Sequence, residues 1–248
     1  MLEHKKIQNL SDYFVELNSR REKGVYFYRI NGYSEEVGEF IKKYYDTARR
    51  TGVVIEGKIP NPDEGNLAYY NEIMGMDFQM SMDFIHVSLR KWLPRMNEFQ
   101  RQNVAASIYD SLDSLRKAGK TENMLRNAYI KFMCWLYYKF ERIVNQLGEN
   151  HIPKILYEGQ ISNYELMLIS ILSNAGCDVV LLQYAGDQGY LKTDPGSVLS
   201  DSLQMEGLQP FPQGYCVKKV RDEIQNELNN ERLYGIRPSL TNLYKVHG

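Results

Sequence analysis

Two glutamates, Glu56 and Glu158, stand where they could carry out acid–base chemistry. Glu56 directly follows the apolar run Val53–Ile55, and Glu158 directly follows Ile155–Tyr157. A carboxylate in such a place can accept hydrogen bonds from ribose or sugar hydroxyls, and it can act as a general base if burial raises its pKa. The alternative is that both side chains only cap backbone groups. We name Glu56 and Glu158 as candidate catalytic residues.

Other polar residues and glycines follow apolar runs in the same way and are candidates for binding a ligand. Arg29 has five donors, which suit a phosphate or a carboxylate, and Lys58 stands in a loop that Pro60 and Pro62 stiffen. A surface ion pair for Arg29 and a solvated charge for Lys58 are the alternatives. The candidate ligand-binding residues are Arg29, Asn31, Gly32, Lys58, Asn61, Gly159, Ser162, Asn163 and Asp187.

The glycines and the helix-start residues of this set have their own chemistry. Gly32 and Gly159 are expected first in tight turns, and close approach of a ligand is the second interpretation. Free amides where a helix begins, near Ser162 and Asn163, can hold an anion. Asp187 could bind a divalent cation through a phosphate, although aspartates in loops are usually solvated.

The pattern of residues 152–184 predicts a strand, a helix and a second strand. Ser162 and Glu165 have the spacing of a capping box, and Gly176 stands where a helix would end. Val179–Leu182 is apolar at every position, as in a strand that is covered on both faces. Two such strands joined by a crossover helix form a right-handed parallel βαβ unit.

A similar unit is predicted in residues 1–63. A β-rich run ends at Ile30, Ser34 opens an amphipathic helix, Gly52 ends that helix, and Val53–Ile55 forms the next strand. The two units resemble each other, but coincidence explains this likeness better than duplication, because most βαβ units share these features.

The chain between the two units, residues 64–150, is predicted to be helical. Its longest predicted helix begins at Thr121 and ends at Gly148. Residues 151–248 then hold the second unit and a C-terminal helix, and residues 236–248 are expected to be only partly ordered. The predicted fold is therefore α/β, with a small parallel sheet built from two βαβ units and a large helical insertion or cap.

The predicted fold gives the candidate residues a common location. In an open parallel sheet, ligands bind beyond the carboxyl ends of the strands. The tips after Ile30, Ile55, Tyr157 and Leu182 carry the candidate residues, and Gln183 and Tyr184 lie at the fourth tip. If all four strands share one parallel sheet, these groups converge along one edge and form one site.

Composition argues against several classes of protein. The chain has 30 basic and 31 acidic residues, so a net charge of −1 gives no reason to expect a nucleic acid or an anionic membrane as partner. No apolar stretch approaches ~18 residues and no secretory N-terminus is present, which favours a cytoplasmic protein. The three cysteines have no CxxC spacing and indicate a reducing compartment.

Three familiar motifs fail on inspection. The segment GVVIEGK, residues 52–58, matches the first seven positions of a phosphate-binding loop, but Ile59 stands where serine or threonine is required. The four histidines are scattered without metal-ligand spacing, so no metal site is predicted. No GxSxG elbow exists, so a hydrolase triad has no support, and the residues name no cofactor.

The stretch IPKILYEGQISNYELMLISILSNAGCDVVLLQY, residues 152–184, resembles the YceG-like family of bacterial tellurite-resistance and stress-response (Ter) operons. The segments YRINGYSEE and EGKIPNPDE are similar to a second part of that family. Its members are described as components of a "biosynthetic module". The resemblance implies a cytoplasmic protein that works beside enzymes making a nucleoside-like or other small metabolite, and it implies no catalytic residues. Family members tend to be longer, so this chain is expected to be one portion or a short variant.

Two functions compete on this evidence. The first is binding or processing of a nucleotide, a sugar nucleotide or a phosphorylated metabolite, with Arg29 and Lys58 neutralising phosphate and a glutamate orienting or deprotonating a hydroxyl. The second is a non-catalytic interaction or scaffold protein of a stress-response complex, which other operon-encoded proteins would join. The first is the main prediction and the second is the alternative, which the long helical region and the lack of a strong catalytic motif motivate.

Overall fold

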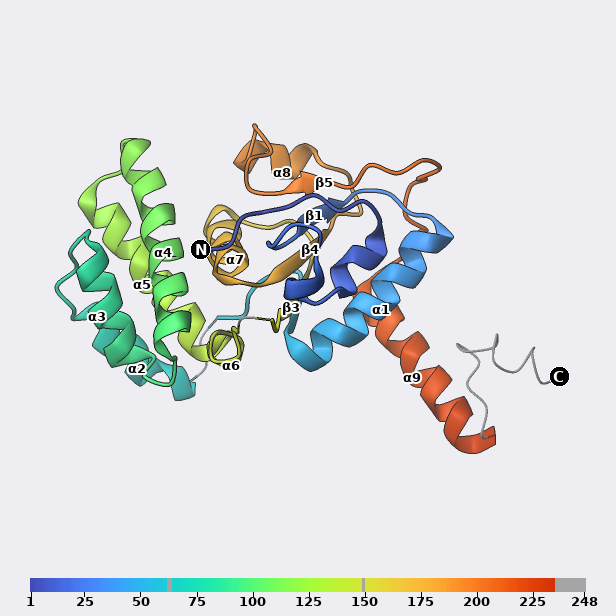
Figure 1. Ribbon diagram of the computed structural model, residues 1–248, viewed down its shortest axis with the longest axis horizontal. Helices are drawn as coiled ribbons and strands as arrows, with labels where there is room; N and C mark the ends of the chain where they lie inside the picture. The colour runs from blue at the N-terminus through green and yellow to red at the C-terminus, as the bar shows by residue number, and fades with distance from the viewer. Residues whose placement is uncertain (62–63, 149, 235–248) are drawn as a thin grey trace.

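A five-stranded parallel sheet forms the centre of the molecule, as the computed structural model shows for residues 1–61, 64–148 and 150–234 (Figure 1). Parallel pairing is what the sequence predicts, and the α/β class is confirmed. The expectation about residues 236–248 concerns residues outside this described part. The strands are β1 (Phe27–Ile30), β2 (Val53–Glu56), β3 (Lys154–Glu158), β4 (Asp178–Leu182) and β5 (Asp201–Ser202).

The strand order is β2-β3-β4-β1-β5, so the two predicted βαβ units interleave. β1 pairs with β4 rather than with β2, with Ile30 opposite Leu182, and β3 pairs with β2, with Glu158 opposite Glu56. Helix α1 (Glu35–Thr51) carries the chain from β1 across to the far edge of the sheet. The strands of the second unit, β3 and β4, lie between β2 and β1, and β4 pairs directly with β1. The short edge strand β5 has no counterpart among the predicted strands.

One face of the sheet is covered by α1 and the N-terminal segment. The segment contains the 3-10 turns Leu10–Phe14 and Leu17–Ser19. The buried Tyr13 hydroxyl donates to the carbonyl of Val179 at 2.7 Å, and that of Tyr44 donates to the carbonyl of Ile155 at 3.0 Å. These bonds satisfy two phenols that would be costly to bury alone. They fix α1 and the N-terminal segment against β3 and β4.

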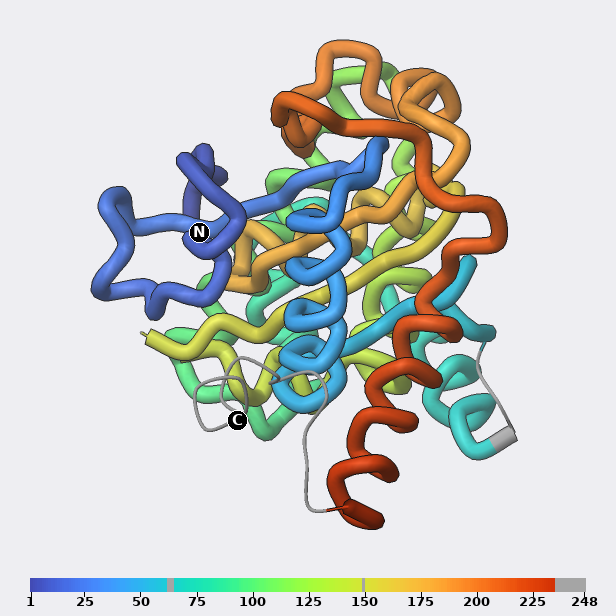
Figure 2. The backbone as a smooth tube through the Cα atoms, turned by 90° about the vertical axis from the view of Figure 1, so that its right-hand side faces the viewer, coloured from blue at the N-terminus to red at the C-terminus, as the bar shows by residue number. Residues whose placement is uncertain are grey.

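The other face is covered by α7 (Asn163–Ala175), and α4 (Glu98–Lys117) packs on α7 from outside. The predicted caps of α7 are confirmed: Ser162 and Glu165 form a capping box, and Gly176 ends the helix with a φ of +132°. Figure 2 looks onto these layers from the α1 side, with α1 in front of the strands and the green helices of the chain behind them. The sheet is therefore sandwiched between α1 and the α7–α4 pair.

Helices α2 to α5 form a lobe beside the sheet, which we call the helical lobe (Figure 1). It contains α2 (Leu67–Met74), α3 (Met82–Trp92), α4 and α5 (Glu122–Tyr138), preceded by the 3-10 turn Glu64–Asn66 and followed by α6 (Glu141–Val144). The helix predicted from Thr121 to Gly148 is thus broken after Tyr138. At the break, the side chain of Phe140 is fully buried in the hydrophobic core.

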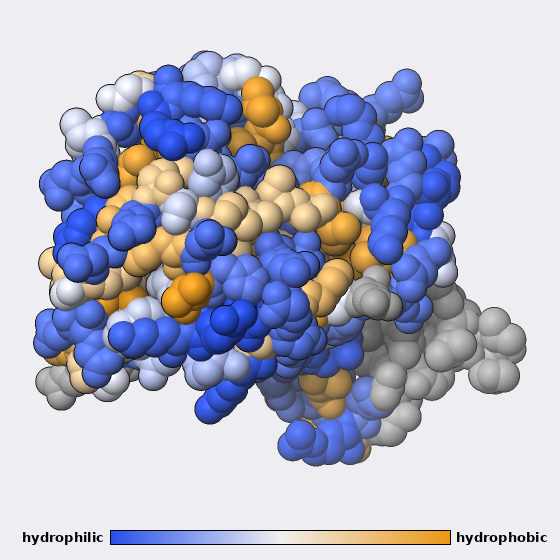
Figure 3. All heavy atoms as spheres, turned by 60° about the vertical axis from the view of Figure 1, so that its left-hand side comes forward, coloured by the Kyte–Doolittle hydropathy of each residue, from blue (hydrophilic) through white to orange (hydrophobic). Residues whose placement is uncertain are grey.

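The surface of the helical lobe mixes hydrophilic and apolar side chains (Figure 3). Large apolar residues that are exposed on it include Leu67, Met74, Met82 and Val87. No helix in the described part of the chain is long and apolar enough to cross a membrane.

A buried charge cluster closes the amino ends of β3 and β4. Asp178 is fully buried and accepts two hydrogen bonds from Arg20, at 2.9 and 2.6 Å, and another from the ammonium of Lys154. Arg20 also donates to three backbone carbonyls of the N-terminal segment. This cluster ties the N-terminal segment to the amino ends of the strands. The candidate residues lie at the opposite, carboxyl ends.

The chain after β4 contains two further helices. The short helix α8 (Gln188–Thr193) lies where the sequence predicts only turns and a loop, and α9 (Val217–Tyr234) is the predicted C-terminal helix. α9 packs against α1 at its beginning and then extends away from the body of the molecule (Figure 1).

Candidate functional site

The polar residues predicted at the strand tips lie on one side of the molecule, at the carboxyl ends of the strands, because all five strands run in the same direction. They fall into two neighbouring groups. One surrounds Arg29 at the end of β1, and the other surrounds Glu158 at the end of β3. Gln183 and Tyr184, consecutive residues after β4, contact one group each.

Arg29 is a buried structural cation, with 1 % of its surface exposed. Its Nε and Nη2 atoms donate to the two carboxylate oxygens of Asp187, both at 2.8 Å. Its Nη1 atom donates to Ser197 and Ser200, and the ring of Tyr190 lies 4.2 Å below the guanidinium. All three nitrogens are thus bonded to protein oxygens, and an anionic ligand would have to displace them.

The carboxylate of Asp187 accepts hydrogen bonds from Arg29 and Gln183, so protein groups occupy the oxygens that a divalent cation would need. Burial acts to raise the pKa of Asp187, but hydrogen bonds from Arg29 and Gln183 outweigh it and hold the pKa below its ordinary value. Gln183 donates to Asp187 at 2.7 Å and to Asn31 at 2.6 Å. The predicted residues Arg29, Asn31 and Asp187 therefore form one network, with Gln183 at its centre.

Gly32 lies where residues 208 and 209 pass close to the end of β1. The backbone of the next residue, Tyr33, exchanges two hydrogen bonds with Gln209, at 2.6 and 2.8 Å. A Cβ at Gly32 would lie 3.0 Å from the Cβ of Leu208. The glycine thus allows the 203–216 segment to pass closely, which favours the structural interpretation over contact with a ligand.

Glu158 binds groups of the protein itself. The Tyr184 hydroxyl donates to Glu158 Oε1 at 2.6 Å, and the backbone N–H of Val217, at the start of α9, donates to the same atom at 2.7 Å. Burial and this hydrogen bond raise the pKa of Tyr184, so the phenol keeps its proton. Rings of Phe211 and Tyr215 pack against Tyr184 at 4.9 and 5.8 Å between centroids.

The second candidate catalytic residue, Glu56, lies at the sheet edge with an exposed side chain. It forms an ion pair with Arg221 of α9 at 3.1 Å, and both partners are more than 40 % exposed. Next to it, Gly57 and Gly159 bring the ends of β2 and β3 together, since a Cβ at Gly159 would lie 3.3 Å from the Cα of Gly57. Gly159 has a φ of +113°, which a residue with a side chain would adopt only under strain.

Glu165, which the sequence indicates only as a capping residue, is the most connected carboxylate here. It accepts from the N–H of Ile59 at 2.7 Å, from the Tyr157 hydroxyl at 2.8 Å and from the Ser162 hydroxyl at 2.6 Å. Its charge already stands at the N-terminus of α7, so the dipole expected to hold an anion beside Ser162 and Asn163 is occupied. The capping-box spacing is the signal that points to this residue.

Two cavities flank α5 where the helical lobe meets the sheet edge. One of about 490 Å³ is lined by Asn163, Tyr164 and Lys120, and one of about 300 Å³ is lined by Asn61, Trp135 and Lys131. The Lys131 ammonium lies 5.2 Å from the rings of both Trp135 and Tyr164, so it stands between the two cavities. Among the candidates, Asn61 and Asn163 are the residues that line these spaces.

The structure thus places the candidate residues at the carboxyl ends of the strands, but some are buried and bonded to protein groups whereas others are exposed. Lys58 is exposed, and no ion pair joins it to any residue in the described ranges. Lys120, Lys131, Tyr164 and Trp135 were not predicted, because they come from distant helices and no local spacing marks them. No group of three or more metal-binding side chains occurs within residues 1–61, 64–148 and 150–234.

This geometry defines a parallel α/β protein with a helical lobe, and the two cavities lie between helices of that lobe and the segments that follow β2 and β3. The model of the YceG domain family matches residues 5–227, and the chain belongs to this family. No curated protein and no solved structure matches the chain.

Proposed function

We propose that this YceG-domain protein binds a phosphorylated small metabolite, of the nucleotide or sugar-nucleotide class, where α5 faces the start of α7. The observation that carries the proposal is the position of Lys131. Its ammonium lies between the rings of Trp135 and Tyr164, and no carboxylate pairs with it in the part of the chain that the structure describes.

An ammonium in this setting suits phosphate. Aromatic faces attract a cation but do not neutralise its charge, whereas phosphate oxygens would do so. Lys120 lines the larger cavity on the other side of Tyr164 and adds a second positive charge. We therefore place the phosphate of the ligand near Tyr164, between Lys131 and Lys120.

The rest of the ligand would occupy the two cavities. Their volumes, about 490 and 300 Å³, are of the size that small-molecule sites have. Tyr164 and Trp135 offer ring faces for a base, and Asn163 and Asn61 offer amide groups for base or sugar hydroxyls. Burial raises the pKa of Cys134 in the smaller cavity to about 11, so its thiol is protonated and is not a nucleophile at neutral pH.

The geometry favours binding over processing. Glu158 already bonds to Tyr184 and Val217, and Glu56 is paired with Arg221 in solvent. A general base needs a carboxylate oxygen that is free to reach the substrate. If the ligand is also processed, Glu158 would act after Tyr184 and the start of α9 have moved away from it, and Glu56 after its ion pair has opened.

The proposed setting is a stress-response biosynthetic module of the tellurite-resistance type, in the cytoplasm. The likeness of residues 152–184 to YceG-like proteins of such operons supports it. The described cysteines are free thiols, two of them buried, which suits a reducing compartment. The metabolite would then be a substrate, product or signal of enzymes that the same operon encodes.

Calorimetric titration with nucleoside diphosphates, sugar nucleotides and inorganic pyrophosphate tests the proposal. We expect a ligand of this class to bind at micromolar to millimolar concentration, and Lys131→Met to weaken it about tenfold, which corresponds to losing one charge-assisted contact. Lys23→Met removes an exposed charge at the opposite edge and serves as the matched control. Absence of binding by the whole panel, or equal effects of the two variants, would reject the site.

A second function, as a non-catalytic interaction protein, is favoured by α9. Its later part extends from the body and exposes Leu228, Leu233 and Tyr234, with 44, 72 and 72 % of their surfaces accessible. Such a helix can supply an apolar face to a partner protein. Capture of an operon-encoded protein that Leu228→Glu abolishes, and Lys131→Met leaves intact, would support this function over metabolite binding.

A further inference from the structure

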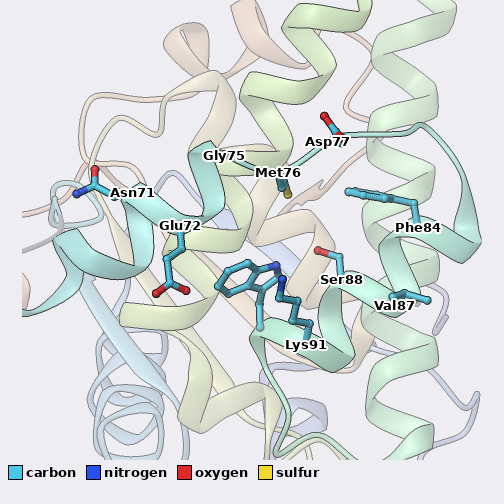
Figure 4. A pocket seen from close by; sticks show the side chains of 10 residues that line it. Asn71, Glu72, Gly75, Met76, Asp77, Phe84, Val87, Ser88 and Lys91 are labelled. Carbon is cyan, nitrogen blue, oxygen red and sulfur yellow. The ribbon is translucent and has the colours of Figure 1, made fainter.

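The helical lobe holds a cavity of about 650 Å³ between α2 and α3. Figure 4 shows its two carboxylates, Glu72 and Asp77, on opposite sides of this space. These charges therefore do not converge on one ligand. The segment that joins β5 to α9 has contacts that point more directly to a binding site.

This segment, residues 203–216, crosses the carboxyl ends of the strands, and we call it the strap. Figure 2 shows it in orange to red, running down the right-hand side of the molecule into α9. Gln209 exchanges two backbone hydrogen bonds with Tyr33, which follows β1. Phe211 then packs on Tyr184, which follows β4. The strap therefore lies where open α/β sheets bind their ligands.

The neighbouring strands β1 and β4 form a topological switch point beneath the strap. The chain leaves β1 through α1 toward β2, and Ile41 of α1 packs in the core on one face of the sheet. The chain leaves β4 through α8 toward β5, and Tyr190 of α8 packs in the core on the α7 face. Adjacent parallel strands whose connections part in this way leave a crevice between them, which is the common ligand position of such folds.

Phe211 fills the space above this switch point. Its ring centre lies 5.7 Å from that of Tyr33, 4.9 Å from that of Tyr184 and 5.2 Å from that of Tyr215. Tyr184 is fixed by its 2.6 Å hydrogen bond to Glu158. We call the space between these three tyrosine rings the tyrosine slot. The rings surround one phenyl group of the strap as they would surround the ring of a ligand.

A stiff piece of chain between two glycines carries Phe211. Gly207 and Gly214 have φ values of +77° and +75°, a conformation that glycine adopts at little cost. Among the described residues, no atom lies within 4 Å of a Cβ built at Gly207, so crowding does not require glycine there. Pro210 and Pro212 restrict the backbone between the glycines. All four residues are exposed, so rotation at the glycines would lift Phe211 and break few contacts.

We propose that the tyrosine slot binds a heteroaromatic ring of the nucleobase kind, and that Phe211 occupies the slot as an internal competitor when the strap is closed. The amides of Asn31 and Gln183, at the ends of the same two strands, suit the polar edge of such a ring. A ligand that binds only the open form shifts the strap toward opening. The inference does not depend on the phosphorylated metabolite proposed for the α5–α7 region.

Adenosine is the probe, because it carries a purine ring and no phosphate. In an NMR titration of the whole chain we expect a Kd between about 1 and 10 mM. Phe211→Ala removes the competitor and should tighten binding at least about tenfold, because the aromatic contacts that close the strap are lost. Tyr33→Ala removes a wall of the slot and should weaken binding instead.

The opposite signs of these two effects distinguish a binding slot from a merely structural cluster, in which both variants would act alike. Phe99→Ala is the matched control, because Phe99 lies on α4 with 42 % of its surface exposed. It should leave the adenosine Kd unchanged.

A disulfide can hold the strap closed. A Cβ at Gly32 would lie 3.0 Å from the Cβ of Leu208, close to the roughly 3.5–4.5 Å that disulfides span. The test protein carries Gly32→Cys and Leu208→Cys, with Cys216→Ser to remove the native thiol of the strap. When oxidised it should not bind adenosine, and after reduction with dithiothreitol it should bind adenosine again.

The outcomes that overturn this inference are separate from failure of the phosphorylated-metabolite site, whose ligands should bind the oxidised and reduced proteins equally. No adenosine binding below about 10 mM by wild type and by Phe211→Ala with native circular dichroism would exclude the slot. Binding that the disulfide does not block, or that Phe211→Ala weakens, would place the ring elsewhere. If Phe211→Ala lacks native circular dichroism, the comparison of oxidised and reduced protein decides alone.

Discussion

The Tyr184 hydroxyl donates a 2.6 Å hydrogen bond to Glu158 and thereby ties the end of β4 to the end of β3. The same carboxylate oxygen accepts from the backbone N–H of Val217, at the start of α9. One glutamate therefore joins two central strands to the C-terminal helix. In the free protein this makes Glu158 a positioning residue for the edge of the sheet.

The two candidate catalytic glutamates should differ in their effect on stability. Glu158→Ala removes the acceptor for Tyr184 and for the start of α9, and should cost about 1–2 kcal/mol of unfolding free energy. Glu56→Ala breaks an exposed ion pair and should cost less than about 0.5 kcal/mol. Urea denaturation followed by circular dichroism measures both. Equal losses would contradict the structural role of Glu158.

Arg29 should behave as a structural cation. Arg29→Met leaves Asp187 and two serines without their donor in a largely buried place, so we expect a loss of about 3 kcal/mol. Arg49→Met removes a half-exposed partner of Asp46 on α1 and should change stability by less than about 0.5 kcal/mol. A stable Arg29→Met protein that has lost only phosphate binding would instead support the anion-clamp interpretation.

Stability should fall in acid partly because of Asp187. Burial opposes ionisation of this carboxyl, but bonds from Arg29 and Gln183 prevail and lower its pKa in the folded protein. The stabilisation is therefore complete above the unfolded pKa of about 3.9 and is lost as pH falls through the folded value. Asp187→Asn should be less stable at pH 7, and its stability should decline less between pH 4 and more acid solution. Parallel pH curves for the two proteins would refute this linkage.

Glu165 should hold the loop that follows β2. Glu165→Ala removes acceptors from the Ile59 amide and the Tyr157 hydroxyl, and should cost about 2–3 kcal/mol. Hydrogen exchange at the Ile59 amide, in the loop after β2, should accelerate more than exchange at the amides of β2 and β3. Glu122→Ala, at the exposed start of α5, is the control and should affect neither quantity by much.

Gly52 should tolerate no side chain. A Cβ there would lie 1.7 Å from the carbonyl oxygen of Lys154, which is backbone of the neighbouring strand. Gly52→Ala should therefore cost on the order of 3 kcal/mol or more, because β2 and β3 must move apart. A Cβ at Gly148 would meet its nearest atoms at 3.8 and 3.9 Å, so Gly148→Ala should be nearly neutral. Similar melting temperatures for the two variants would argue against this close approach.

Local sequence patterns were enough to predict the individual helices and strands discussed next. The capping box of Ser162 and Glu165, the ending of α7 at Gly176 and the continuous apolar run before Gln183 all depend on residues a few positions apart. Such signals predict elements and, through the burial of both strand faces, a parallel sheet. The run Val53–Ile55 predicts a strand where a phosphate-binding loop would need a flexible turn, and this strand is confirmed as β2, Val53–Glu56.

The sequence by itself therefore determined the α/β class, the helical lobe and the shared edge of the strand tips. Only the tertiary structure decided that β4 docks between β3 and β1, that Arg29 pairs with Asp187, and that Lys131 meets Tyr164. The physical reason is range. Helix caps and strand patterns come from neighbours along the chain, whereas these pairings join residues far apart in sequence and form only when packing of the elements brings them together.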